Sequence, residues 1–190
     1  MKKIFILVIG VILLMTGCNS KEEYLSGKVN VEIDVENYGV IALELDADTA
    51  PITVTNFVNL VNEKFYDGLT FHRIIDGFMI QGGDPDHNGT GGSSKKIVGE
   101  FSSNGIKNDI SHVRGVISMA RSQMNNSASS QFFIVHEDST YLDGNYAAFG
   151  HVTKGIEVVD EIAKNAIVED GNGTVLYENQ PVIKSIRVIE

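Results

Sequence analysis

Residues 71–92, FHRIIDGFMIQGGDPDHNGTGG, hold side chains that could bind a metal ion or a phosphate. Asp84 to Gly89 match the first six positions of an EF-hand calcium loop, whose twelfth position must be a bidentate Glu. That position is Lys95, so a cation stands where the strongest ligand belongs. The glycines up to Gly92 lack the Gly-Lys-Ser/Thr sequence that opens the helix of a phosphate-binding loop. Turn formation therefore explains this half of the stretch better than ligand binding does.

Other residues that support catalysis or metal binding are not grouped in the sequence. Asp84 and Asp86 lie on a glycine-rich loop, where sequential carboxylates form turns more often than they transfer protons. No G-x-S-x-G sequence marks a hydrolase nucleophile, which leaves a hydrolase as the weakest hypothesis. We therefore expect no metal and no cofactor. The histidines are far apart, with no pair at the spacing of metal ligands: His72, His87, His112, His136 and His151.

Arg73 lies inside the apolar run FHRII, close in sequence to Phe78, Met79 and Gln81. An arginine is protonated at any relevant pH and presents several N–H donors in a fixed fork, which suits it to hold a polar group of a ligand. The alternative is an arginine at the edge of a sheet, with its stem across the sheet and its charge in water. The residue types alone leave both interpretations open.

The segments around Arg73 are predicted to be short strands. Residues 29–35 and 41–45 alternate apolar with polar side chains on either side of a tight turn, as half-buried strands do. One helix is predicted from Pro51, which suits a first turn, and a second over 156–164. Abundant turn glycines and further short apolar runs favour an antiparallel barrel or sandwich with helices over its open ends. These runs are FHRII, FMIQ, GVISMA, SQFFIVH, AAFGHV and KSIRVI.

The first residues of the chain predict export. Two lysines precede an apolar run shorter than the ~20 residues of a membrane-spanning helix, which favours a removable signal over a permanent helix. The sequence LMTGC, ending at Cys18, resembles the lipobox of bacterial lipoproteins, with Met15 where the lipobox usually has Leu. The resemblance implies cleavage before Cys18 and two acyl chains as a stable anchor. We expect a signal peptide over 1–17, a lipidated Cys18 with a flexible tether over 18–28, and one domain over 29–190.

The composition of the chain limits the kinds of partner that it can bind. The net charge of −10 repels phosphate backbones and anionic lipid head groups, so we expect no nucleic acid and no membrane contact other than the lipid. Cys18 is the only cysteine, which excludes an intramolecular disulfide. We expect a monomer on the outer face of the cell membrane, or on the periplasmic side where an outer membrane is present.

The segments around Arg73 resemble those of the cyclophilins, the cyclosporin-binding family of peptidyl-prolyl isomerases. The similar segments occur in that family's order and span Val29 to the C-terminus: FHRIIDGFMIQGGDP, GTGG, GVISMA, SSQFFI, LDGNYAAFG and VIKSIRVI. The resemblance implies a mainly β fold, a closed eight-stranded antiparallel β-barrel capped by two α-helices. It also implies faster rotation about peptide bonds before proline, with proline-containing unfolded or exported polypeptides as partners.

The resemblance implies roles for individual side chains. Arg73 is expected to be catalytic, through hydrogen bonds to the substrate around the prolyl imide, and Gln81 to help hold it. Ordinary core is the alternative for two of the apolar residues, Phe133 and Leu142. The expected substrate-binding residues are His72 beside the arginine; Phe78, Met79, Phe133 and Leu142 around the proline ring; Ala120, Arg121 and Ser122 along the substrate backbone; Gln131 in the neighbouring groove; and Tyr141 and Tyr146 at the pocket.

The sequence departs from the family pattern in a few places. Tyr141 stands where cyclosporin-sensitive members have Trp, and Tyr146 where they have His, which weighs against tight cyclosporin binding. Neither side chain must transfer a proton, so turnover is expected to survive. Arg121 replaces an Asn of animal members, and residues 123–126 are one residue longer. Two functions of different classes follow: an isomerase assisting the folding of exported proteins at the membrane surface, or a non-catalytic holdase that binds proline segments.

Overall fold

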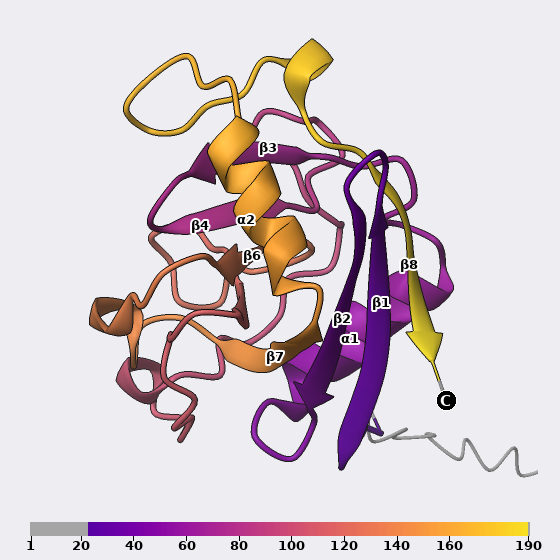
Figure 1. Ribbon diagram of the computed structural model, residues 1–190. Helices are drawn as coiled ribbons and strands as arrows, with labels where there is room; N and C mark the ends of the chain where they lie inside the picture. Colours follow the sequence, from indigo (N-terminus) through magenta and orange to yellow (C-terminus); the bar gives the residue numbers. More distant parts are fainter. Residues whose placement is uncertain (1–22, 190) are drawn as a thin grey trace, which may run out of the picture.

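The computed structural model of the protein describes residues 23–189 (Figure 1). The predicted signal peptide over 1–17, the predicted lipidation site Cys18 and residues 19–22 lie outside the described residues. From residue 23 to residue 189, no helix has both the length and the apolar character that crossing a membrane requires. Near the start of the described residues, the Leu25 N–H donates to Thr55 Oγ1 at 2.8 Å.

Eight antiparallel strands form one curled sheet, in the order β3-β4-β6-β5-β7-β2-β1-β8. The mainly β fold with eight strands is therefore confirmed, and the alternating segments of the sequence become the paired strands β1 and β2. The strands are β1 (Lys28–Val35), β2 (Gly39–Asp46), β3 (Phe71–Ile75), β4 (Met79–Gly82), β5 (Val116–Met119), β6 (Phe132–Val135), β7 (Ala148–Lys154) and β8 (Ile183–Ile189).

The sheet is open, so the expected closed barrel is wrong. Its two edge strands, β3 and β8, form no ladder with each other within residues 23–189. The two edges meet just before β3 begins, where Thr70 and Val182 form an isolated bridge. Farther along β3, the Ile74 N–H donates to the Gly173 carbonyl at 2.8 Å, so the loop before β8 occupies this edge. These hydrogen bonds take up backbone groups of β3 that a ladder with β8 would need.

Two helices, α1 (Pro51–Asn62) and α2 (Ile156–Asn165), cover the curled sheet. Figure 1 shows α1 behind β1 and β2, and α2 in front of the sheet. The predicted apolar stripe of α1, which includes Phe57, is buried. No side chain of the helix's own N-cap residue bonds to its first turn; Glu100 from a distant loop accepts the N–H groups of Ile52 and Thr53 instead, at 3.0 and 2.7 Å.

The strands near Arg73 separate two buried clusters. Ile74, Ile80 and Ile134 pair across β3, β4 and β6, and their side chains belong to the main core inside the curl. Since side chains alternate along a strand, their neighbours belong to the outer face. There a second cluster is buried, consisting of Met79, Val116, Phe133, Val135 and Ala148, with Ile75, Phe78, Ile110, Ala120, Leu142 and Tyr146 packed against it.

Candidate active site

Strand register places the predicted catalytic residues side by side on the outer face of the sheet. Arg73 on β3 pairs with Gln81 on β4, and Gln81 pairs with Phe133 on β6. Phe133 pairs in turn with the buried Ser118 of β5. Directly opposite residues in antiparallel strands have Cβ atoms about 4.5–5.5 Å apart. The register therefore puts a cation, an amide and an apolar ring in one row.

A pocket of about 160 Å³ opens over this row. Its volume and its mixed lining suit a small apolar ring with a polar group at one side. Phe133 is nearly fully buried, and Leu142 and Tyr146 come from the loop between β6 and β7. The pocket brings together many of the predicted site residues: Arg73, Phe78, Met79, Gln81, Ala120, Arg121, Phe133, Leu142 and Tyr146.

Protein groups orient the Arg73 guanidinium from two sides. Its Nε donates to the carbonyl oxygen of Asn172 at 2.8 Å. Its Nη1 lies 3.4 Å from Gln81 Oε1 and 3.8 Å from Met79 Sδ. The guanidinium carbon lies 5.9 Å from the ring centroid of Phe78. No partner for Nη2 occurs among residues 23–189, so donors remain for a ligand in the pocket.

The half-buried position of Arg73 changes its electrostatics without removing its charge. Burial lowers the pKa of Arg73, while Tyr146 and the carboxylate of Asp170 raise it in part. An arginine nevertheless stays protonated in proteins. Because the surroundings are less polar than water, each N–H donor of the guanidinium acts more strongly on a ligand than it would in solvent.

A chain of hydrogen bonds holds Gln81 from behind. Gln81 Nε2 donates to Gln131 Oε1 at 2.8 Å. Gln131 Nε2 in turn donates to the carbonyl oxygens of Gly89 and Gly91, at 3.1 and 2.8 Å. Gln131, predicted in the neighbouring groove, and Ser122, predicted along the substrate backbone, line a second hollow of about 200 Å³. This hollow shares Gln81, Ala120 and Arg121 with the first. The glycine loop therefore supports the amide that contacts the arginine.

Asp84 organises that glycine loop as a set of backbone turns. Its carboxylate accepts the N–H groups of Asp86 at 2.8 Å, Asn88 at 3.2 Å and Gly89 at 2.6 Å. Burial would raise the pKa of Asp84, but these N–H groups outweigh burial and lower it. Across residues 23–189, no three His, Cys, Asp or Glu side chains are grouped to hold a metal ion. The acidic half of residues 71–92 is thus a structural turn.

Comparison with known proteins gives the family. Residues 29–188 match the family model described as cyclophilin type peptidyl-prolyl cis-trans isomerase. The chain belongs to the cyclophilin family. It is 41% identical over 161 residues to peptidyl-prolyl cis-trans isomerase A of Dickeya dadantii, covering 80% of each chain. It is 44% identical to a peptidyl-prolyl cis-trans isomerase of Helicobacter pylori, over 78% of this chain and 89% of the relative.

Cyclophilin structures also match the fold. A cyclophilin-type isomerase of Cryptosporidium parvum, solved in the presence of the dipeptide Ala-Pro, superposes with a TM-score of 0.74. That match has 31% sequence identity and covers 85% of this chain and 99% of the other. The family and its relatives make this cyclophilin a peptidyl-prolyl cis-trans isomerase.

Two predicted site residues of this cyclophilin, His72 and Tyr141, line neither hollow. His72 is buried beside Arg73, and its two ring nitrogens have no hydrogen-bond partner among residues 23–189. Burial is the main reason that the pKa of His72 is lowered, so the ring is neutral at physiological pH. Tyr141 is 69% exposed, with its ring centroid 5.9 Å from that of Phe78. It borders the pocket through Phe78 rather than lining it.

The Arg121 side chain makes contacts that sequence reasoning missed. Its Nε donates to the Asn145 carbonyl at 2.9 Å, and its guanidinium carbon lies 4.9 Å from the centroid of the Tyr146 ring. The residue was expected to act through its backbone. Its side chain instead connects the Tyr146 wall to the segment along the second hollow. Arg121 and Tyr146 are far apart in the sequence, which gives no signal of this contact.

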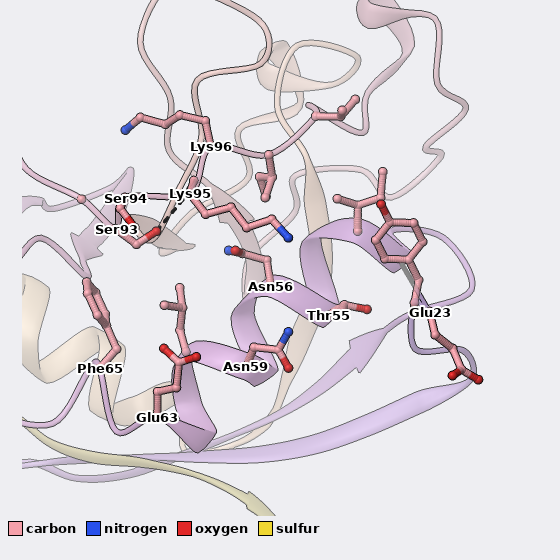
Figure 2. Close-up of a pocket in the computed structure, with 16 residues that line it drawn as sticks. Glu23, Thr55, Asn56, Asn59, Glu63, Phe65, Ser93, Ser94, Lys95 and Lys96 are labelled. Carbon is pink, nitrogen blue, oxygen red and sulfur yellow. Dashed lines mark hydrogen bonds between the residues drawn. The ribbon is translucent and has the colours of Figure 1, made fainter. Parts of the chain in front are cut away.

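A larger hollow of about 640 Å³ lies elsewhere on this cyclophilin, between α1 and residues 92–98 (Figure 2). Figure 2 shows Asn56 and Asn59 of α1 and Glu63 just after the helix on one side, and Lys95 and Lys96 on the other. Arg73 does not line this hollow, so size alone would have selected the wrong place for the chemistry. The small pocket at Arg73 is the better candidate because donors and apolar walls converge there.

Proposed function

We propose that Arg73 accelerates rotation of the peptide bond before proline, while the pocket at Phe133 holds the proline ring. The observation that carries this proposal is the guanidinium, fixed on two sides, with unused donors beside an apolar socket. The related Cryptosporidium structure was solved in the presence of the dipeptide Ala-Pro, which supports proline-containing peptides as ligands.

The reaction needs no nucleophile and no proton carrier. Rotation about a peptide bond has a barrier of ~18–20 kcal/mol, and the uncatalysed event before proline takes tens to hundreds of seconds. When the bond twists, conjugation is lost and the nitrogen lone pair localises, which creates an acceptor that the planar bond lacked. A donor aimed at this nitrogen binds the twisted state better than either planar state. Each 1.36 kcal/mol of such differential binding is worth about tenfold in rate.

The roles of the other side chains follow from their contacts. Gln81 lies 3.4 Å from Arg73 Nη1, and we infer that it restricts the guanidinium to one orientation. The rings of Phe133 and Tyr146 meet edge to face, with centroids 5.9 Å apart, and offer an apolar corner to the proline ring. The ring is then held still while the acyl side of the peptide turns.

The test of this function is exchange NMR on an Ala-Pro peptide with the mature domain. We expect exchange between the cis and trans signals to become much faster than the uncatalysed process. Peptide binding without faster exchange would refute catalysis and would support the holdase, which binds proline segments without turning them over.

We further propose that the protein is anchored by lipid at Cys18 and acts as a monomer on newly exported chains. Support comes from the lipobox-like sequence and from the position of the described N-terminal end. In Figure 1 the described chain begins at the lower right, whereas the loop with residues 140–147 lies at the left. An anchor at that end would leave the pocket open to solvent.

The anchor has its own experiment. Replacing Cys18 with Ser is expected to release the protein from membranes, because the thiol that receives the lipid is lost. Continued membrane association of the Cys18→Ser protein would contradict lipidation and favour an uncleaved helix. Sedimentation of the released domain would test the proposal that the protein is a monomer.

A further inference from the structure

The Arg73 guanidinium contacts a loop far away in the sequence. Its Nε donates to the carbonyl of Asn172, which belongs to the segment between α2 and β8. A backbone carbonyl cannot change rotamer, so it fixes the guanidinium only as well as its own loop is fixed. The structure of that loop therefore bears on how precisely Arg73 is aimed.

Asp170 holds this loop in one conformation. Its Oδ1 accepts the N–H of Asn172 at 2.9 Å and the N–H of Thr174 at 3.1 Å. Its Oδ2 accepts the Thr174 hydroxyl at 3.0 Å, and its carbonyl accepts the N–H of Gly173 at 3.1 Å. Four hydrogen bonds from one residue thus enclose the peptide unit that presents its carbonyl to the arginine.

The same turn is fastened directly to the edge of β3. Thr174 pairs with Arg73 itself, and the N–H of Val175 donates to the His72 carbonyl at 3.1 Å. Gly173 has a φ of +80°, and a Cβ there would lie 2.3 Å from the Ile74 carbonyl oxygen. Such a close approach allows only glycine at this position. The bridge, the hydrogen bond and the close approach at Gly173 therefore hold the turn against the strand that carries the arginine.

We propose that Asp170 is a positioning residue for Arg73: it closes the turn that holds the Asn172 carbonyl against the guanidinium Nε. This inference rests on the proposed role of Arg73. Asp170 is itself exposed and does not line the pocket, so it acts on the reaction through the arginine. Its carboxylate also keeps negative charge near the guanidinium, which favours the protonated form.

The chain offers a matched control in Asp46, at the turn between β2 and α1. Asp46 Oδ1 accepts the N–H groups of Asp48 and Thr49, at 3.1 and 3.0 Å, and its Oδ2 accepts the Thr49 hydroxyl at 3.0 Å. The turn bonds are the same as at Asp170, and no pocket residue is in contact, although Asp46 also pairs with Lys28 at 2.8 Å. Asp46→Ala therefore reports what loss of such a turn, together with this ion pair, does away from the pocket.

The experiment measures kcat and KM for an Ala-Pro peptide in Asp170→Ala, Asp170→Asn and Asp46→Ala, alone and combined with Arg73→Lys. Asp170→Ala is expected to lower kcat about fivefold with little change in KM, the size of one lost hydrogen bond felt in the transition state. Asp170→Asn keeps an Oδ1 acceptor and should recover most of the activity, and Asp46→Ala should leave kcat unchanged. In the Arg73→Lys protein, which has no Nε–H, Asp170→Ala should cause no further loss.

An NMR signal gives a second measure that does not depend on activity. The Nε–H resonance of Arg73 should be shifted and protected from solvent exchange in the wild type and in Asp46→Ala, and should lose both properties in Asp170→Ala. An unchanged resonance or an unchanged kcat in Asp170→Ala would overturn the inference, and so would an equal loss in the Arg73→Lys background. If Arg73→Lys were as active as the wild type, the proposed role of Arg73 would fail instead.

Discussion

Replacing Asp143 with Ala tests whether the pocket wall is held from behind. Asp143 follows Leu142, and its carboxylate accepts the Ser111 hydroxyl at 2.6 Å, the His112 N–H at 2.7 Å and the His112 Nδ1–H at 2.8 Å. The His112 side chain is 1% exposed, and its Nε2 lies 3.0 Å from the hydroxyl of Ser118 under the pocket. The loop with Leu142 is therefore tied to β5 through one buried imidazole.

The magnitude follows from which donors lose their partner. Each buried donor left unsatisfied costs about 1–3 kcal/mol, and Asp143→Ala strands the two donors of His112. Ser111 is partly exposed and can turn its hydroxyl to water. We therefore expect a fall of about 2–6 kcal/mol in the free energy of unfolding, with a raised KM because the Leu142 wall loosens.

Urea denaturation monitored by circular dichroism measures this change in the free energy of unfolding. Ser111→Ala removes only the exposed hydrogen bond to the same carboxylate and should change the free energy of unfolding by less than about 0.5 kcal/mol. Equal effects of Asp143→Ala and Ser111→Ala would refute the account, because the buried imidazole would then contribute nothing.

Three further predictions concern pH, cyclosporin and the start of α1. Burial lowers the pKa of His72 and of His112, so these rings are neutral in the folded protein, while their unfolded pKa is about 6.5. Stability should thus be complete above about pH 6.5 and fall as the pH drops through the lowered folded values; a urea midpoint equal at pH 7.5 and 5.5 would be inconsistent with this. Tyr141→Trp adds a larger ring beside Phe78 and should tighten cyclosporin binding about two- to tenfold in a calorimetric titration, whereas unchanged affinity would dissociate this position from the drug. Glu100→Ala strands buried donors in the first turn of α1 and should lower the free energy of unfolding by about 2–4 kcal/mol in a denaturant melt; a change below 1 kcal/mol would rule out capping by this side chain.

The periodicity of apolar residues predicted the strands and helices of this fold, because each of these elements buries one face in the core. The alternation in residues 29–35 and 41–45 became β1 and β2, and the apolar stripe after Pro51 became the buried face of α1. The prediction of a closed barrel was wrong because closure depends on which segment pairs with the edge of β3. That partner, residues 173–175, lies in a loop without periodicity, and local sequence does not encode such long-range pairing.

The apolar part of the pocket could be placed from sequence only through the family resemblance. From composition and spacing alone, Arg73 could be either an exposed residue at a sheet edge or a ligand-binding residue. The same patterns predicted Phe133 to be an ordinary core residue. The supporting contacts were not predictable, because Asn172 acts through a backbone carbonyl and Asp84 through turns that resemble a calcium loop. A carbonyl carries no residue type, so only the folded chain shows that it faces a guanidinium.

We propose that the Arg73 guanidinium stabilises the twisted prolyl bond. The most direct test is the catalysed cis/trans exchange rate of an Ala-Pro peptide, measured by NMR with the mature wild-type domain and with Arg73→Ala. Charge-assisted hydrogen bonds are worth about 1.5–3 kcal/mol each, so we expect the catalysed rate to fall at least about tenfold, with the fold and peptide binding retained. Equal catalysed exchange rates in the two proteins would mean that Arg73 does not stabilise the twisted bond.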